Sequence, residues 1–294
     1  MTDVADPPTD SAPPTGPARW TAQWKELYEE VVTSGLCTGC AGCVIACPHD
    51  VLGYDHSSGG YRPFHLEDEL GASDCVHGQK GCTSCTRACP RYQHWETQAD
   101  DHLFARERTE DEVSGIYSDI LLTRASDDHV HELGQDGGLV SAILIWLLEE
   151  DYIDGALVSY LEGDGSSWVA KPGVATTTEE VLASAGSRYT YSANTLAYDE
   201  AMERGLERLA LVGMSCQSSV PPVMWSRKVG KVSKPFLFNI GLLCSKTFDD
   251  SIFEELFEAK YGLTRAMIKK VNIKGKFQIW THDGEYHEVP LKEC

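Results

Sequence analysis

The sequence is short of positive charge and has no long apolar run. Its 294 residues carry 25 Lys and Arg against 45 Asp and Glu, a formal net charge of -20. This excess of acid argues against general nucleic-acid binding and against binding to anionic membranes. The best apolar run, Leu139–Leu148, contains Ser141 and is shorter than the roughly 18 residues of a membrane helix. Membrane insertion is therefore not expected.

Several nucleotide and catalytic signatures are also missing. No G-x-G-x-x-G follows a strand and no G-x-x-x-x-G-K-[ST] occurs, so a nicotinamide Rossmann domain and an ATPase are both unsupported. The ten histidines are scattered and indicate no particular acid or base. No hydrophobic signal segment is present, which favours a cytoplasmic protein.

Cysteine, in contrast, is plentiful and closely spaced in one stretch. Two runs each end on C-x-x-x-C-P, and they contain Cys37, Cys40, Cys43 and Cys47, then Cys75, Cys82, Cys85 and Cys89. In such runs the cysteine before proline ligates the cluster of the other run. The sequence thus predicts two interlocked 4Fe-4S sites. Cys89 completes the site of Cys37, Cys40 and Cys43, and Cys47 completes that of the later run.

Two other uses of these cysteines stay open. Structural zinc also binds paired C-x-x-C knuckles, although it needs neither a third cysteine at the next two-residue step nor a following proline. Disulfides would require export, and the close spacings suit metal better than crosslinks. The longer gap between Cys75 and Cys82 departs from the strict bacterial spacing, so the second site is assigned less firmly than the first.

Composition divides the chain into a small module and a larger domain. We expect a disordered tail over 1–18, a ferredoxin-like two-cluster module over 19–95 and a polar linker or exposed helix over 96–114. Residues 115–294 alternate between strand-like and helical patterns, which is typical of an α/β domain with a mixed sheet. The expected fold class is therefore α+β, a 2x(4Fe-4S) module followed by an α/β domain.

The periodicity predicts the following elements. Helical spacing covers Trp20–Val32, with Gly35 as its C-terminal cap, and a hairpin covers Val51–Phe64. Strands are expected at Ile116–Thr123, Ala156–Tyr160, Leu209–Val212 and Leu237–Leu243, and helices at Leu139–Glu150, Glu179–Ala185, Leu196–Arg204 and Ile252–Tyr261. The C-terminal part reads as antiparallel strands over Lys269–Ile273, Phe277–Thr281 and Glu285–Leu291.

Two local features of the larger domain suggest ligand contacts. Gln135-Asp136-Gly137-Gly138 stands directly before a helix, where backbone amides can receive a phosphate or a flavin edge, although such a pair is more often a tight entry turn. A basic island, defined here as Arg227, Lys228, Lys231 and Lys234, contains no acid. It could attract an anionic coenzyme; equally, it could be a solvated loop or a docking site for an acidic protein.

Further motifs resemble one flavoprotein family. They follow Gln135–Val140 along the chain and are Ile153–Ala156, Ala175–Thr177, Gly186–Tyr189, Val212–Gln217 and Ile240–Cys244. In their order and spacing they are similar to the beta subunits of hydrogenases and dehydrogenases that use the deazaflavin coenzyme F420, a family that includes plant 7-hydroxymethyl chlorophyll reductase. The resemblance covers about 115–294, and members with a two-cluster module resemble the chain from Cys37 onward.

The resemblance implies FAD beside an iron-sulfur cluster. It assigns Gln135, Gly137, Gly138, Ser187, Arg188 and Tyr189 to contacts with the flavin or the substrate. It also implies a possible third 4Fe-4S cluster on Cys216 and Cys244, together with a C-x-x-C segment that follows in relatives but is absent here. The alternative is that Cys216 and Cys244 are buried free thiols. Met214-Ser215 and Arg188 depart from the usual family residues. On this basis the chain is expected to be a fragment, impaired, or completed by another chain, with Cys294 an exposed terminal thiol.

The expected function is that of an iron-sulfur oxidoreductase that exchanges hydride with coenzyme F420, or a similar small redox molecule, at FAD. Single electrons would then pass through the clusters to or from a partner protein. One alternative is a ferredoxin-like electron-relay subunit without an active flavin site. Others are a reductase of a chlorophyll-like substrate and, less expected, an interaction protein held together by zinc.

Overall fold

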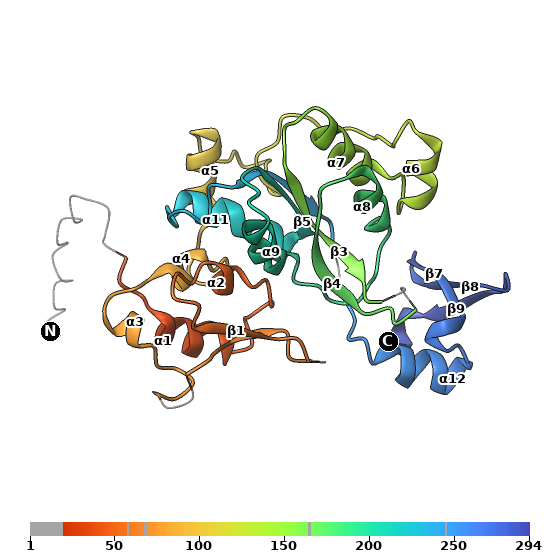
Figure 1. The fold of residues 1–294 in the computed structure, drawn as a ribbon, viewed down its shortest axis with the longest axis horizontal. Helices are drawn as coiled ribbons and strands as arrows, with labels where there is room; N and C mark the ends of the chain where they lie inside the picture. The colour runs from red at the N-terminus through yellow and green to blue at the C-terminus, as the bar shows by residue number, and fades with distance from the viewer. Residues whose placement is uncertain (1–19, 58, 68–69, 164–165, 245) are drawn as a thin grey trace, which may run out of the picture.

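The fold consists of an N-terminal cysteine module, a central mixed sheet and a C-terminal antiparallel sheet (Figure 1). It is seen in a computed structural model that describes residues 20–57, 59–67, 70–163, 166–244 and 246–294. The predicted tail over 1–18 lies outside these residues. Among the described helices, none combines the length and the apolar character that a membrane crossing needs.

The cysteine module is built from short helices and one hairpin. Its elements are α1 (Trp24–Leu27), η1 (Tyr28–Val32), α2 (Gly42–Ile45), β1 (Leu52–Asp55), β2 (Arg62–His65), α3 (Val76–Gln79) and α4 (Ser84–Ala88). The predicted first helix forms from Trp24 onward, since its buried residues Trp24, Leu27 and Val31 face the cysteines. The predicted hairpin is confirmed, because β1 and β2 pair antiparallel.

The central sheet is mixed, as predicted. Its strand order is β4-β3-β5-β6, with β3 antiparallel to β4 and the other pairs parallel. The strands are β3 (Gly155–Leu161), β4 (Ala170–Ala175), β5 (Leu209–Met214) and β6 (Phe236–Leu242). Strand β4 was missed by the sequence reading because Lys171, Pro172 and Gly173 all disfavour a strand. Proline is tolerated here because β4 is an edge strand.

Helices cover both faces of this sheet. They are α7 (Leu139–Glu149), α8 (Thr178–Ala183), η3 (Asn194–Leu196), α9 (Ala197–Glu203), α10 (Ser215–Ser218) and α11 (Val220–Ser226). Outside them, α6 (Asp128–Leu133) packs on α7 and α5 (Glu96–Phe104) packs on α11. Side chains of β5 alternate, so Ala210 and Val212 face α7 and α8 while Leu209 and Leu211 face α9 and α11. The predicted helices at 139–150, 179–185 and 196–204 are thus confirmed.

The predicted strand over 116–123 is wrong. These residues form no regular structure, and Ile120, Leu121 and Leu122 are 83%, 76% and 105% exposed. The residue types favour a strand, but no strand of the described chain pairs with this segment. In contrast, the region expected to be a linker or exposed helix contains α5, which packs on α11 and buries Ala99 and Asp100.

The C-terminal part forms the predicted antiparallel sheet over a small aromatic core. Its elements are η4 (Phe253–Glu258), α12 (Ala259–Tyr261), η5 (Arg265–Met267), β7 (Ile268–Ile273), β8 (Lys276–Thr281), β9 (Tyr286–Pro290) and η6 (Leu291–Glu293). The helix expected over 252–261 is present, although most of it is π-helical. Phe253, Phe257 and Phe277 form the centre of this core.

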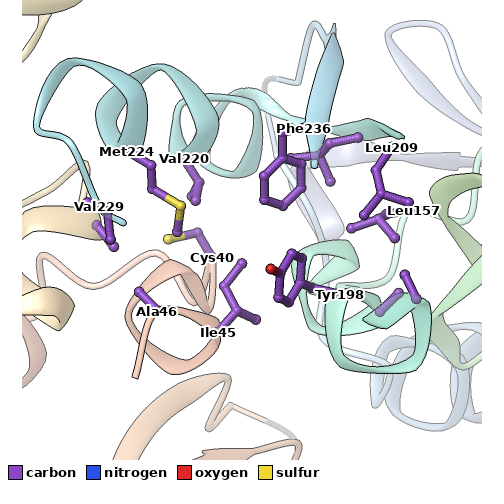
Figure 2. Packing of buried hydrophobic residues seen from close by; sticks show 14 of the residues in the cluster. Cys40, Ile45, Ala46, Leu157, Tyr198, Leu209, Val220, Met224, Val229 and Phe236 are labelled. Carbon is purple, nitrogen blue, oxygen red and sulfur yellow. The ribbon is translucent and has the colours of Figure 1, made fainter. Parts of the chain in front are cut away.

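The cysteine module and the central sheet share one hydrophobic core (Figure 2). Ile45 and Ala46 of the module face Tyr198, Met224 and Phe236 of the larger domain. Each part also has a core of its own, around Trp24 and Leu27 in the module and around Leu144 and Ala210 in the larger domain, so the shared core joins the two. Amphipathic periodicity identifies the buried face of an element but not the element that covers it.

Candidate iron-sulfur and ligand-binding sites

Four cysteines from both runs line one cavity of the module. They are Cys37, Cys40, Cys43 and Cys89, and we call them the first quartet. Cys40, Cys43 and Cys89 are buried and Cys37 is partly buried. The apolar side chains of Leu27, Val31 and Val32 also line this cavity. The structure therefore brings together the four residues predicted for the first cluster, including the crossed ligand Cys89.

A second cavity is lined by the other four cysteines. Cys47, Cys75, Cys82 and Cys85 form this second quartet, again with one member from the other run. The buried side chains of Trp24 and Leu52 also line the cavity. His49 and His77 line it too, and their rings stack with centroids 3.6 Å apart. The long spacing between Cys75 and Cys82 is accommodated by α3, so it does not prevent the residues from meeting.

The electrostatics of the thiols follow the same grouping. Burial raises the pKa of Cys43, and the neighbouring thiols, Cys89 foremost, raise it further. Burial likewise raises the pKa of Cys85, with Cys82, Cys47 and Cys75 adding to the effect. Four mutually repelling thiolates in an apolar cavity need a metal charge to balance them. The donor set thus fits a 4Fe-4S cluster in each cavity. Within the described residues, no three His, Cys, Asp or Glu side chains converge to hold a single metal ion.

Residues of the larger domain hold the loop between Cys37 and Cys40. The Tyr191 hydroxyl donates to the Thr38 carbonyl at 2.8 Å, and the Thr195 hydroxyl donates to the Cys40 carbonyl at 2.5 Å. On the module side, the Tyr54 hydroxyl donates to the Gly39 carbonyl at 2.7 Å. No motif indicated these three residues, and the roles of Tyr191 and Thr195 depend on the packing of two segments more than 150 residues apart.

An open cleft at the carboxyl ends of β5 and β6 gathers most of the predicted flavin contacts. Gln135, Ser187, Arg188 and Tyr189 all line it. Its volume is about 390 Å³, within the range of small-molecule sites. Ligands of α/β proteins commonly bind outside the carboxyl ends of the parallel strands. Four of the six motifs therefore meet at this cleft, namely Gln135–Val140, Gly186–Tyr189, Val212–Gln217 and Ile240–Cys244.

One asparagine joins two of these residues. Gln135 Nε2 donates to Asn272 Oδ1 at 2.6 Å, and the Tyr189 hydroxyl donates to the same oxygen at 3.0 Å. The Tyr189 hydroxyl in turn accepts from the Ile273 amide at 3.0 Å. Tyr189 itself has a φ of 62°, which is unusual for a bulky residue, and such backbone strain clusters at functional sites. No motif indicated Asn272. It lies in β7 of the C-terminal sheet, far along the chain from Gln135 and Tyr189.

Two buried polar atoms at the cleft lack a partner within the described chain. They are Ser159 Oγ and Arg188 Nε. The rest of the Arg188 guanidinium donates to the Ala185 and Gly186 carbonyls, and burial lowers its pKa. Lys246 also lines the cleft. Unpaired buried polar atoms are costly, so a polar ligand with anionic groups fits this cleft.

Gly137 and Gly138 are the two predicted contacts that do not line the cleft. Gly138 precedes α7 with a φ of 67°, and a Cβ at this position would lie 2.4 Å from the Val130 carbonyl oxygen. Gly137 has a φ of 118°, and a Cβ at this position would lie 3.3 Å from the Cβ of Arg124. Both glycines thus have a local packing reason, and their contact with a cofactor stays a prediction.

Cys216 and Cys244 lie near each other after the adjacent strands β5 and β6. Burial raises the pKa of Cys216, and the charge of Cys244 raises it further. Cys244 is exposed and lines the cleft, and Cys216 packs at the edge of the shared core. The structure brings the two residues together, and their role in a third cluster stays a prediction. Cys294 is exposed, as expected.

The basic island divides into a buried and an exposed part. Arg227 is 6% exposed and contacts the cysteine module, whereas Lys228, Lys231 and Lys234 are exposed. None of the four lines the cleft. Arg227 is therefore not accessible to an anionic coenzyme, so the predicted attraction does not hold for the whole island.

Family models match the chain in three segments. The model of the N-terminal part of the coenzyme F420 hydrogenase/dehydrogenase beta subunit matches residues 120–198. The model of its C-terminal part matches residues 206–294. Together they take in more than half of the chain. The chain belongs to the coenzyme F420 hydrogenase/dehydrogenase beta subunit family. A model of the 4Fe-4S dicluster domain matches residues 36–93, which contain both cysteine runs.

Two relatives show how much of the chain is shared. The coenzyme F420 hydrogenase subunit beta of Methanothermobacter thermautotrophicus is 35% identical over 62% of this chain. A coenzyme F420-dependent sulfite reductase of Methanocaldococcus jannaschii is 32% identical over 92% of this chain. The matches span 65% of the hydrogenase subunit and 40% of the sulfite reductase, in both cases less than two thirds of the relative.

A solved structure shares the fold of part of the chain. A chain in the xenon-derivatised F420-reducing [NiFe] hydrogenase complex from Methanosarcina barkeri is 32% identical, with a TM-score of 0.53. The match covers 58% of the 294-residue chain and 59% of the hydrogenase chain.

Proposed function

We propose that this family member is an iron-sulfur flavoprotein oxidoreductase that exchanges hydride with coenzyme F420 and relays electrons to or from a partner protein. The observation that carries the proposal is the pair of cavities, each lined by four cysteines in crossed grouping. This arrangement supports two 4Fe-4S clusters. The relatives are named as subunits or enzymes that act with coenzyme F420, which supports the substrate.

The cleft supports FAD as the site of hydride exchange. Its cationic groups Arg188 and Lys246 suit a diphosphate in a chain of net charge -20. Ser159 Oγ and Arg188 Nε are free to donate to a ligand. When bound, FAD supplies two-electron hydride chemistry, and 4Fe-4S clusters supply one-electron transfer.

One segment of chain separates the cleft from the first quartet. Thr190, Ser192 and Asn194 line the cleft, while the alternate residues Tyr191 and Thr195 hold the loop of the first quartet. Asn194 and Thr195 belong to the 3-10 helix η3, in which neighbouring side chains point in different directions. The short separation supports electron passage between the cleft and the first quartet.

The experiment is anaerobic preparation followed by addition of FAD and reduced coenzyme F420. The expected result is about eight irons and eight sulfides per chain, FAD binding, and oxidation of the deazaflavin with reduction of the clusters. The relay alternative predicts the same iron content but no flavin binding and no deazaflavin oxidation. Bound zinc without acid-labile sulfide would contradict both and support an interaction protein.

A further inference from the structure

Arg227 is a buried cation at the junction of the two halves of the molecule. It follows α11 directly and is 6% exposed. Its guanidinium lies over the Trp20 ring, 4.8 Å from the ring centroid. The nitrogen Nη1 donates to the Cys89 carbonyl at 3.0 Å, and Nη2 donates to the Tyr92 carbonyl at 2.9 Å. Longer bonds reach Thr86 and Gln93. One side chain therefore holds the backbone on both sides of Cys89.

The module returns the contact through Arg87. Its Nε donates to the Arg227 carbonyl at 2.8 Å, and its Nη2 donates to the Lys228 carbonyl at 2.5 Å. Arg227 thus binds module carbonyls on both sides of Arg87, and Arg87 binds the backbone of Arg227 and Lys228, across the junction between α4 and α11. Such paired contacts fix the position of Arg227 relative to Cys89 from two directions.

The charge of Arg227 has no acidic partner. Among the described residues, no carboxylate oxygen lies within 4.0 Å of its guanidinium. Burying an unpaired cation is costly, and carbonyl dipoles and an aromatic face offset only part of that cost. Cys89 of the first quartet is an ionisable group whose charge acts on the Arg227 guanidinium. A cluster bound there would supply the missing counter-charge.

We propose that Arg227 is a positioning residue for the first quartet. Its guanidinium holds Cys89 in place and makes a cluster bound by the first quartet easier to reduce. The inference rests on the proposed iron-sulfur function. Reduction adds one negative charge to a cluster, and a fixed buried cation stabilises that added charge. Cluster potentials are known to depend on net charge, hydrogen bonds and solvent exposure.

The test compares Arg227→Gln, Arg227→Lys and Lys231→Gln in the full chain with its clusters. Lys231→Gln is the matched control, since it removes the same charge from an exposed position of the same island. The readout is an anaerobic redox titration followed by electron paramagnetic resonance, which reports the midpoint potential of each cluster without any substrate.

In Arg227→Gln, the midpoint potential of one of the two clusters should fall by at least 59 mV, which corresponds to a tenfold change in the equilibrium constant of a one-electron reduction. The midpoint potential of the other cluster should not change. Arg227→Lys should recover most of this shift because it keeps the charge. The control should move neither potential. Unchanged potentials in Arg227→Gln, or equal shifts in Arg227→Gln and Lys231→Gln, would overturn the inference.

The variant Arg227→Gln could also release iron. Loss of about four irons, with the second cluster intact, would support the positioning role because only the first quartet contains Cys89. If Arg227→Gln loses all iron, Arg227→Lys decides: recovery of both clusters supports the role of the charge, and failure to recover either overturns it. A parent protein without iron and sulfide would refute the proposed function itself, a result that differs from all of these.

Discussion

Replacing Asn272 with alanine should weaken flavin binding without direct contact between Asn272 and the flavin. Asn272 is 8% exposed, and its Oδ1 accepts from both Gln135 and the Tyr189 hydroxyl. Each such hydrogen bond contributes a net ~0.5–1.5 kcal/mol. Loss of both hydrogen bonds should therefore destabilise the positions of Gln135 and Tyr189 at the cleft by about 1–3 kcal/mol. Since 1.4 kcal/mol corresponds to a tenfold change in Kd, FAD affinity should fall roughly 5- to 150-fold.

The assay is a titration of the cluster-containing protein with FAD, followed by quenching of flavin fluorescence. Asn239→Ala is the matched control, because Asn239 Nδ2 makes a 2.6 Å hydrogen bond to the Ser218 carbonyl but does not line the cleft. The control should bind FAD like the parent. FAD affinity that is unchanged in Asn272→Ala, or reduced equally in both variants, would refute the reasoning.

Two further predictions concern the cysteine module. Ile45→Ala should destabilise the whole protein by about 2–5 kcal/mol in one cooperative denaturant transition, because Ile45 lies in the core shared by both halves. Ile120→Ala, at an 83% exposed position, should change stability by less than about 0.5 kcal/mol. Separate transitions for the halves in Ile45→Ala would contradict the shared core. Gly39→Ala should selectively lower the occupancy of the first cluster, measured as iron content, since its Cβ would lie 2.4 Å from the Tyr61 carbonyl oxygen. Gly59→Ala has a similar φ of 72° but no atom near its Cβ, so equal iron loss in both variants would show that backbone strain alone is responsible.

The cysteine grouping could be predicted from the sequence because it depends on local spacing. Tight loops place the first three thiols of each run around one point, and the cysteine before proline turns away toward the other run. The cavities contain Cys89 and Cys47 in these crossed places. Strand β5 was also predictable because it is a continuous apolar run, and the C-terminal hairpin of β8 because its buried residues alternate.

The remaining features depend on contacts between distant segments. No sequence signal indicated Asn272, and the basic island indicated Arg227 but not its contacts, since each acts on residues more than 80 positions away. The segment over 116–123 carries β-branched and apolar residues typical of a strand, yet no described strand pairs with it. Strand β4 shows the reverse, because its pairing with β3 overrides the unfavourable residues Lys171 and Pro172.

The crossed grouping of the cysteines is tested most directly by counting iron in paired variants. Cys47→Ser should leave about four irons per chain. Adding Cys75→Ser should remove no more, because both residues belong to the second quartet. Adding Cys43→Ser instead should remove nearly all iron, because Cys43 belongs to the first quartet. If Cys47→Ser with Cys43→Ser kept four irons, and Cys47→Ser with Cys75→Ser kept none, each run would hold its own cluster and the crossed grouping would be contradicted.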